Sequence, residues 1–188
     1  MAREAVRAFL AFEIPSSVRS RLTEIQQGWR RELPRARWTR PEGWHLTLKF
    51  LGEVDLSMLA ALTAELVPEL AGLPKVTVAL RGTGFFPSPT RPRVAWVGGS
   101  SNETDAVVQT IEAAAHAVGF ERERRPWAIH LTQARIKDRW PKSAVESFLK
   151  RGTELDFEAF DCREVVLIKS DLRPDGAVYT ALERMPLG

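Results

Sequence analysis

A short motif that occurs twice in the same setting is the strongest constraint on this chain. The tetrads at residues 45–48 (His-Leu-Thr-Leu) and 130–133 (His-Leu-Thr-Gln) share three of four residues. Leu10, in an apolar run, precedes the first His by 35 residues, and Ala95 precedes the second by the same interval. Such self-similarity indicates a duplicated unit. We therefore expect two lobes related by a pseudo-two-fold axis and facing each other across a cleft, neither stable alone.

Hydrophobic periodicity predicts the same order of elements in each half. Apolar runs and alternating positions predict strands at residues 6–14, 44–51, 76–80, 94–97, 127–136, 155–160, 164–168 and 177–182. Apolar residues at helical spacing predict four helices, which begin at Ser16 or Ser17, after a cap at Asp55, at Asn102 or Thr104, and at Pro141. A Gly/Pro-rich loop at residues 82–92 and turns at Asp161 and residues 174–176 complete the prediction.

Strand geometry places the two polar side chains shared by the tetrads, His and Thr, on one face of each strand. Side chains two residues apart share a face, so the His and Thr of each tetrad project together, while Leu46, Leu48, Leu131 and Gln133 point inward. If the lobes face each other, two imidazoles and two hydroxyls converge on one cavity. An imidazole holds or releases a proton near neutral pH and a hydroxyl donates to phosphate oxygens, which suits acid–base chemistry on a phosphodiester without a metal. The competing interpretation is that His-x-Thr only supplies polar, β-branched strand faces.

Composition argues against a disordered chain, a membrane protein, a secreted protein and a disulfide- or zinc-stabilised fold. The chain has 188 residues, 44% hydrophobic and 27% charged, which is typical of a folded domain. No apolar run approaches the ~20 residues that span a bilayer, and Arg3, Glu4 and Arg7 interrupt the segment where a signal peptide is apolar. One cysteine and three histidines supply little for a disulfide or a zinc site. We expect one two-lobed domain over residues 1–188, a cytoplasmic monomer without membrane contact, metal or cofactor.

The motifs in this setting resemble the 2H phosphoesterase superfamily and, within it, the RNA 2′,3′-cyclic phosphodiesterases, also called 2′-5′ RNA ligases. The resemblance runs over nearly the whole chain. Besides the tetrads, it is carried by residues 9–15 (FLAFEIP), 49–53 (KFLGE), 84–87 (GFFP), 92–94 (PRV), 96–98 (WVG), 134–135 (AR) and 176–179 (GAVY). It implies an α+β fold of two pseudo-symmetric lobes, each an antiparallel sheet backed by helices, with a central active-site cleft.

The resemblance also implies a reaction, in which water opens a 2′,3′-cyclic phosphate on an RNA end or a nucleoside and leaves a 2′-phosphomonoester. On the family pattern His45 is the proton donor to the leaving 3′ oxygen, and His130 is the proton acceptor that activates water. Thr47 and Thr132 hold the phosphate, and Arg135 assists them.

Three positions near the second motif depart from simple strand alternation or from the family pattern. Strict alternation places Arg135 on the face opposite His130, so its role requires a β-bulge, a strand end or a long reach. Ile129 stands where relatives often have proline, and Gln133 replaces the usual apolar residue. These two departures bear on the geometry of the His130 strand and on the turnover rate rather than on the reaction class.

Two other functions use the same residues. The first is ATP-independent 2′-5′ RNA ligation, which is the same chemistry run backwards. The sequence has no Gly-x-x-x-x-Gly-Lys-Ser/Thr loop, which argues against a nucleotide-driven ligase. The second is a non-catalytic module that binds an RNA end.

Residues outside the motifs allow two interpretations. Arginine accounts for 21 of the 27 basic residues, and the clusters at residues 30–37 and 122–125 either guide an RNA backbone toward the cleft or are solvated faces. Four aromatic residues either stack on bases or pack in the core: Phe85, Phe86, Trp38 and Trp44. His116 is expected at the surface, and Cys162 is expected to be unreactive.

Overall fold

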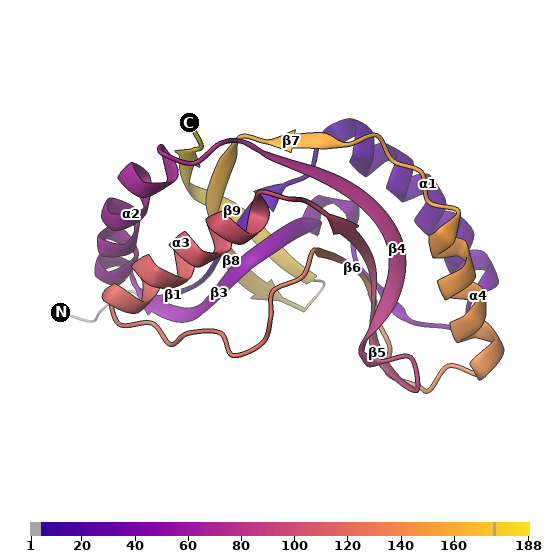
Figure 1. Cartoon of the computed structure of the whole chain (residues 1–188). Helices are drawn as coiled ribbons and strands as arrows, with labels where there is room; N and C mark the ends of the chain where they lie inside the picture. The colour runs from indigo at the N-terminus through magenta and orange to yellow at the C-terminus, as the bar shows by residue number, and fades with distance from the viewer. Residues whose placement is uncertain (1–4, 175) are drawn as a thin grey trace.

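Two antiparallel sheets carry the repeated motifs, one motif on each (Figure 1). The computed structural model describes residues 5–174 and 176–188. The first sheet, sheet A, has the order β3-β1-β8-β9, with β1 at Ala5–Glu13, β3 at His45–Asp55, β8 at Glu164–Arg173 and β9 at Gly176–Pro186. Sheet B has the order β2-β6-β5-β4-β7, with β2 at Arg37–Trp38, β4 at Val76–Ser88, β5 at Arg91–Ser100, β6 at His130–Arg135 and β7 at Phe160–Cys162. The expected α+β class with two antiparallel lobes is confirmed.

Two of the four helices pack on the sheet other than the one whose strand precedes them in the chain. They are α1 (Ser16–Glu32), α2 (Leu56–Leu70), α3 (Thr104–Ala117) and α4 (Lys142–Thr153), and a short 3-10 helix, η1, spans Pro41–Gly43. α1 follows β1 of sheet A but packs beside α4 on sheet B, whereas α3 follows β5 of sheet B but packs beside α2 on sheet A (Figure 1). Each lobe therefore contains one helix from each half of the chain, and neither lobe is a continuous half.

The predicted apolar faces form the core. Leu59, Leu62, Leu66 and Leu70 of α2 are all buried, and α1 buries Val18, Leu22 and Trp29. Full burial of one such side chain contributes ~1.5–3 kcal/mol. Trp29 meets Phe148 of α4 at a ring-centroid distance of 5.0 Å, which holds the two helices of sheet B together.

The two motif strands carry β-bulges at equivalent positions. On β3, Thr47 is opposite Ala11 and Lys49 is opposite Leu10, so Leu48 is the extra residue. On β6, Thr132 is opposite Trp96 and Ala134 is opposite Ala95, so Gln133 is the extra residue. Each bulge falls on the fourth residue of its tetrad, so the internal repeat extends to a local irregularity of the backbone.

Several predicted boundaries were wrong. Residues 82–92 are mostly strand, because Gly82, with φ of +72°, accommodates a register shift rather than ending β4. Residues 155–159 are not a strand; Phe157 is buried in the core without a partner strand, and Asp161 lies within β7 rather than in a turn. The predicted turn at residues 174–176 includes Asp175, which lies outside the described residues.

The helices begin at or within one residue of the predicted positions, but the expected side-chain caps are not formed. Pro15, Asp55 and Glu103 occupy the N-cap positions of α1, α2 and α3, and none of the three makes a side-chain cap hydrogen bond. The helices are therefore held in place by packing of their apolar faces rather than by caps. Within the described segments no helix is both long and apolar enough to cross a bilayer.

Candidate active site

The two histidines begin their strands and are held in the same way. His45 is the first residue of β3 and His130 is the first residue of β6, and both are half-buried. His45 Nδ1 lies 3.0 Å from the carbonyl oxygen of Gly43, and His130 Nδ1 lies 2.9 Å from that of Ala128. A carbonyl oxygen only accepts, so each Nδ1 must carry the proton. Each Nε2 is then the nitrogen available for proton transfer.

The threonines share the histidine faces, as the alternation predicts. Thr47 and Thr132 are half-buried, whereas the residues that flank them in each tetrad are buried: Leu46, Leu48, Leu131 and Gln133. β3 and β6 are in contact, so the two tetrads lie at the junction between the sheets.

The bulges bring one further side chain of each strand to the open face. A bulge reverses the alternation, so the fifth residue after each His rejoins the His face. That residue is the exposed Arg135 on β6, which meets the requirement for a bulge, and Phe50 on β3. Phe50 is 68% exposed, and its ring and that of His45 both contact Phe9. Sequence reasoning missed Phe50, and only the repeated bulge identifies it as the counterpart of Arg135.

Aromatic rings contact both imidazoles. His45 makes edge-on contacts with Phe9 and Tyr179, at ring-centroid distances of 5.7 Å and 5.1 Å. His130 makes an edge-on contact with Phe86 at 5.1 Å, and Phe86 in turn contacts Trp96. These contacts and the Nδ1 hydrogen bonds together favour the observed orientation of each imidazole.

Trp96 lies over two glycines of sheet B. A Cβ atom at Gly84 would lie 2.2 Å from the Trp96 ring, and one at Gly98 would lie 2.8 Å from it. Trp96 is opposite Thr132 in the β5–β6 register, so its ring shares the motif face. The glycines are required here because the indole occupies the space of their side chains.

Hydrogen bonds tie the segment before each motif to the other motif. The indole Nε1 of Trp127 donates to the carbonyl oxygen of Thr47 at 2.9 Å. In the opposite direction, Thr39 Oγ1 lies 2.8 Å from the carbonyl oxygen of Thr132 and accepts from Trp44 Nε1 at 2.8 Å. The relative position of the two tetrads is therefore fixed by direct bonds as well as by packing.

The unusual Gln133 has a partner that the sequence did not suggest. Its Oε1 accepts from Nε2 of Gln26 on α1 at 3.2 Å, and its own Nε2 donates to the carbonyl oxygen of Leu131 at 3.3 Å. Gln26 and Gln133 are 2% and 0% exposed. Gln26 Nε2 also lies within hydrogen-bond distance of the carbonyl oxygens of Gln133 and Thr39. The bulge of β6 is thus held by a buried amide pair instead of an apolar contact.

Burial lowers the pKa of His45 below its ordinary value of 6.5. The nearby Arg19 guanidinium acts in the same direction, while the Gly43 carbonyl and the Glu13 carboxylate oppose it. Glu13 faces His45 across the β1–β3 register, and its carboxylate is engaged by Arg184 at 3.0 Å. In the absence of an anion, His45 is therefore biased toward its neutral form.

The exposed fraction of each side chain decides between base stacking and core packing for three of the four aromatic residues. Trp44 and Phe85 are buried and cannot stack on a base, whereas Phe86 is 39% exposed beside His130. His116 is exposed, as expected. Cys162 is buried, which raises the pKa of its thiol to about 12 and agrees with an unreactive cysteine.

One groove lies away from both motifs. It has a volume of ≈ 800 Å³ between α1 and α4 and is lined by residues such as Arg21, Trp29 and Arg151. None of the predicted site residues lines this groove, and its lining residues belong to neither tetrad. In the part of the chain that the structure describes, no three His, Cys, Asp or Glu side chains group closely enough to hold a metal ion.

Comparison with known proteins agrees with this geometry. Residues 12–96, which include the first motif, match a family model described as LigT like Phosphoesterase. The chain is 34% identical to the RNA 2′,3′-cyclic phosphodiesterase of Thermus thermophilus over 195 residues, with 97% of this chain and 90% of that protein covered. The chain belongs to the LigT-like phosphoesterase family. The expected 2H phosphoesterase membership is thereby confirmed.

Other LigT-like proteins cover this chain to a similar extent. The RNA 2′,3′-cyclic phosphodiesterase of Methanothermobacter thermautotrophicus is 30% identical, with 95% of this chain and 97% of that protein covered. The crystal structure of TT0787 from Thermus thermophilus has a TM-score of 0.79 at 28% identity and covers 96% of this chain and 97% of its own. LigT of E. coli, crystallised with 3′-AMP, shares the fold with a TM-score of 0.75 at 23% identity, over 98% of this chain and 99% of its own.

Proposed function

We propose that this chain hydrolyses 2′,3′-cyclic phosphates, on RNA ends or on nucleosides, to 2′-phosphomonoesters by two-histidine acid–base catalysis without a metal. The observation that carries the proposal is the matched anchoring of His45 and His130. Each Nδ1 is satisfied by a backbone carbonyl, so each Nε2 is left for proton transfer. Family membership and the activity for which the relatives are named support the same reaction class.

The reaction needs one neutral and one charged imidazole. His130, neutral and protonated at Nδ1, takes a proton on Nε2 from water as the water oxygen bonds to phosphorus. The bond from phosphorus to the 3′ oxygen breaks, and charged His45 gives its Nε2 proton to that oxygen. The product is a 2′-phosphomonoester with a free 3′ hydroxyl, and one proton has been taken up and one released. Each transfer is typically worth 10²- to 10⁴-fold in rate.

The remaining open-face residues serve the phosphate and the nucleoside. Thr47 and Thr132 donate hydrogen bonds to the non-bridging oxygens, where charge increases in the transition state. Arg135, brought to that face by the Gln133 bulge, adds a guanidinium that matches phosphate oxygens. The exposed ring of Phe50 offers a stacking face for the terminal base.

The acid role of His45 depends on the substrate. Burial holds its pKa low in the free protein, whereas an acid must be protonated. A phosphate anion bound between the tetrads stabilises the imidazolium and raises the pKa of His45. The proton donor is then charged when substrate is present.

A substrate panel with product assignment tests the proposal. Nucleoside 2′,3′-cyclic phosphates are incubated with the protein in excess EDTA, and the products are assigned as 2′- or 3′-phosphates by ³¹P NMR. We expect 2′-phosphates, and a loss of at least 10²-fold in kcat for His45→Ala and for His130→Ala. Activity abolished by EDTA contradicts the metal-free reaction. Binding without turnover supports the non-catalytic module, and faster formation of 2′-5′ linkages from RNA ends supports the ligase.

A further inference from the structure

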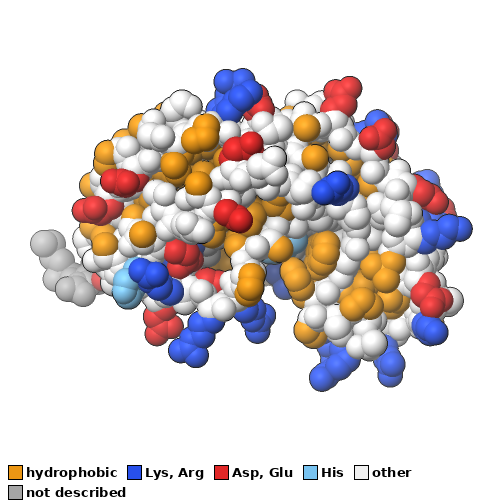
Figure 2. Space-filling model, viewed as in Figure 1, with side chains coloured by type: hydrophobic (Ala, Val, Ile, Leu, Met, Phe, Trp, Pro, Cys, Tyr) orange, Lys and Arg blue, Asp and Glu red, His pale blue; other side chains and the backbone are white. Residues whose placement is uncertain are grey.

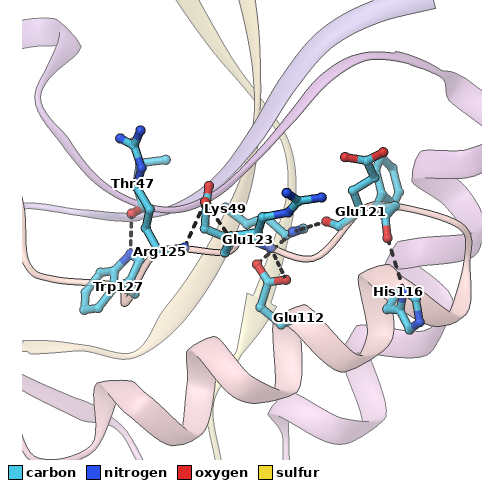
Figure 3. Close-up of polar contacts among 10 residues, drawn as sticks. Thr47, Lys49, Glu112, His116, Glu121, Glu123, Arg125 and Trp127 are labelled. Atoms are coloured by element: carbon cyan, nitrogen blue, oxygen red, sulfur yellow. Dashed lines mark hydrogen bonds and ion pairs between the residues drawn. The ribbon is translucent and has the colours of Figure 1, made fainter.

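The loop that leads into the second motif is held in place by a partly buried ion pair. Lys49, 7% exposed, donates from Nζ to Glu112 Oε1 at 2.7 Å and to the carbonyl oxygen of Glu121 at 2.9 Å. The second carboxylate oxygen of Glu112 accepts from the backbone N–H of Glu123 at 3.1 Å. One ion pair between β3 and α3 thus holds the backbone of residues 121–123 at two points (Figure 3).

The Glu123 side chain accepts hydrogen bonds from the backbone of its own loop. Glu123 Oε1 accepts from the backbone N–H groups of Arg124 and Arg125 at 2.9 Å and 3.2 Å. Its carboxylate is therefore directed to backbone amides rather than to a guanidinium. Two residues further on, the Trp127 indole donates to the Thr47 carbonyl. The loop is fixed to β3, the strand of the first motif, along its length.

The arginines of the loop project into solvent. Arg122, Arg124 and Arg125 are exposed, and within the described residues none of them makes an ion pair. Figure 3 shows the side chain of Arg125 directed away from Glu112. In Figure 2, Lys and Arg side chains project along the margin where this loop runs in Figure 1, next to a notch between the two lobes. Three guanidiniums on a fixed backbone, outnumbering the loop's glutamates, form a positively charged rim.

The rim is close to the proposed phosphate site. Arg125 and Trp127 are separated by two backbone steps, at most ~7 Å, and Trp127 is bonded to Thr47. A 2′,3′-cyclic phosphate is the end of an RNA chain, so the preceding phosphates lead outward from it. Guanidiniums bind such phosphates in a manner independent of sequence.

We propose that Arg122, Arg124 and Arg125 form a binding track for the phosphates upstream of the terminal nucleotide, so that the preferred substrate is an RNA chain rather than a mononucleotide. The inference rests on the proposed function. The Lys49–Glu112 pair is the positioning device that holds the track. Because the arginines contact phosphates only, the track confers affinity without base preference.

The test compares two substrates with one terminal nucleoside: adenosine 2′,3′-cyclic phosphate and a five-nucleotide RNA that ends in it. We expect kcat/KM for the RNA to exceed that for the nucleotide at least 10-fold. Arg124→Gln/Arg125→Gln should lower kcat/KM for the RNA about 10-fold, through KM, and change the nucleotide reaction less than 2-fold. The slope of log(kcat/KM) against log[salt] for the RNA should become shallower by ~0.7 for each phosphate that the variant no longer binds.

Arg30→Gln/Arg31→Gln is the matched control. This adjacent exposed pair lies in the last turn of α1. α1 covers the face of sheet B opposite the histidines, because its Gln26 contacts the inward-facing Gln133. Loss of RNA preference in the control as well, or no RNA preference in the wild type, overturns the track. Binding of the RNA, measured by fluorescence anisotropy, decides the point even if no substrate is turned over. Failure to hydrolyse the nucleotide overturns the proposed function instead.

Discussion

Trp127 and Thr47 are joined by a 2.9 Å hydrogen bond from the indole Nε1 to the backbone carbonyl, which links the segment before one motif to the centre of the other. Thr47 is followed by the bulge at Leu48, where the strand backbone is irregular. The indole therefore ties the segment before the second motif to β3, next to the bulge. The bond is positional, since Trp127 takes no part in proton transfer.

Trp127→Phe should lower kcat clearly while lowering the free energy of unfolding only slightly. The variant leaves the Thr47 carbonyl without this donor, at a cost of ~1 kcal/mol in the free energy of unfolding. Displacement of Thr47 from the phosphate should lower kcat about 10-fold, measured with adenosine 2′,3′-cyclic phosphate. Trp140→Phe is the matched control, because Trp140 Nε1 is buried without a hydrogen-bond partner among the described residues. An equal loss of kcat in both variants contradicts the positional role of Trp127.

The pH dependence should separate the free protein from the substrate complex. An acid is active only when protonated, so kcat/KM should fall as pH rises through the lowered pKa of free His45. Bound phosphate raises the pKa of His45, so kcat should fall at a higher pH than kcat/KM. Both profiles are measured in one buffer series at constant ionic strength. Coincident alkaline limbs argue against His45 as the proton donor.

Gln26 and Gln133 should be coupled in stability. Either single change to Leu leaves the other buried amide without its side-chain partner, at a cost of ~1–3 kcal/mol in the free energy of unfolding. In the double variant both amides are gone, so its loss should be ~1 kcal/mol smaller than the sum of the single losses. Urea denaturation of the wild type and three variants measures the coupling. Additive losses refute the pairing seen across α1 and β6.

Two glycine substitutions should act in opposite directions. Gly84→Ala places a Cβ atom 2.2 Å from the Trp96 ring, which must shift from the motif face, so both the melting temperature and kcat should fall. Gly28→Ala, in α1, meets no atom within 4 Å and should stabilise the helix by ~0.5–1 kcal/mol. Thermal unfolding and the cyclic phosphate assay measure both variants. Unchanged activity in Gly84→Ala excludes Trp96 as a support for the site.

Local sequence determined which side chains of each motif share a face. Alternation along a strand places His45 with Thr47 and His130 with Thr132, and this depends only on the two-residue period of extended backbone. Helical spacing likewise predicted the buried leucines of α2. The repeat of 35 residues between apolar strand and histidine predicted two equivalent units, because it can be counted without any contact between them.

Tertiary structure decided what lies around the motifs. The bulges at Leu48 and Gln133 appear only when each strand is paired with its neighbour, and they determine that Phe50 and Arg135 join the histidine faces. The exchange of α1 and α3 between the lobes, and the partnership of Gln26 with Gln133, join residues up to 107 positions apart. Local periodicity carries no information about such partners, since it records which face of an element is apolar and not which element covers it.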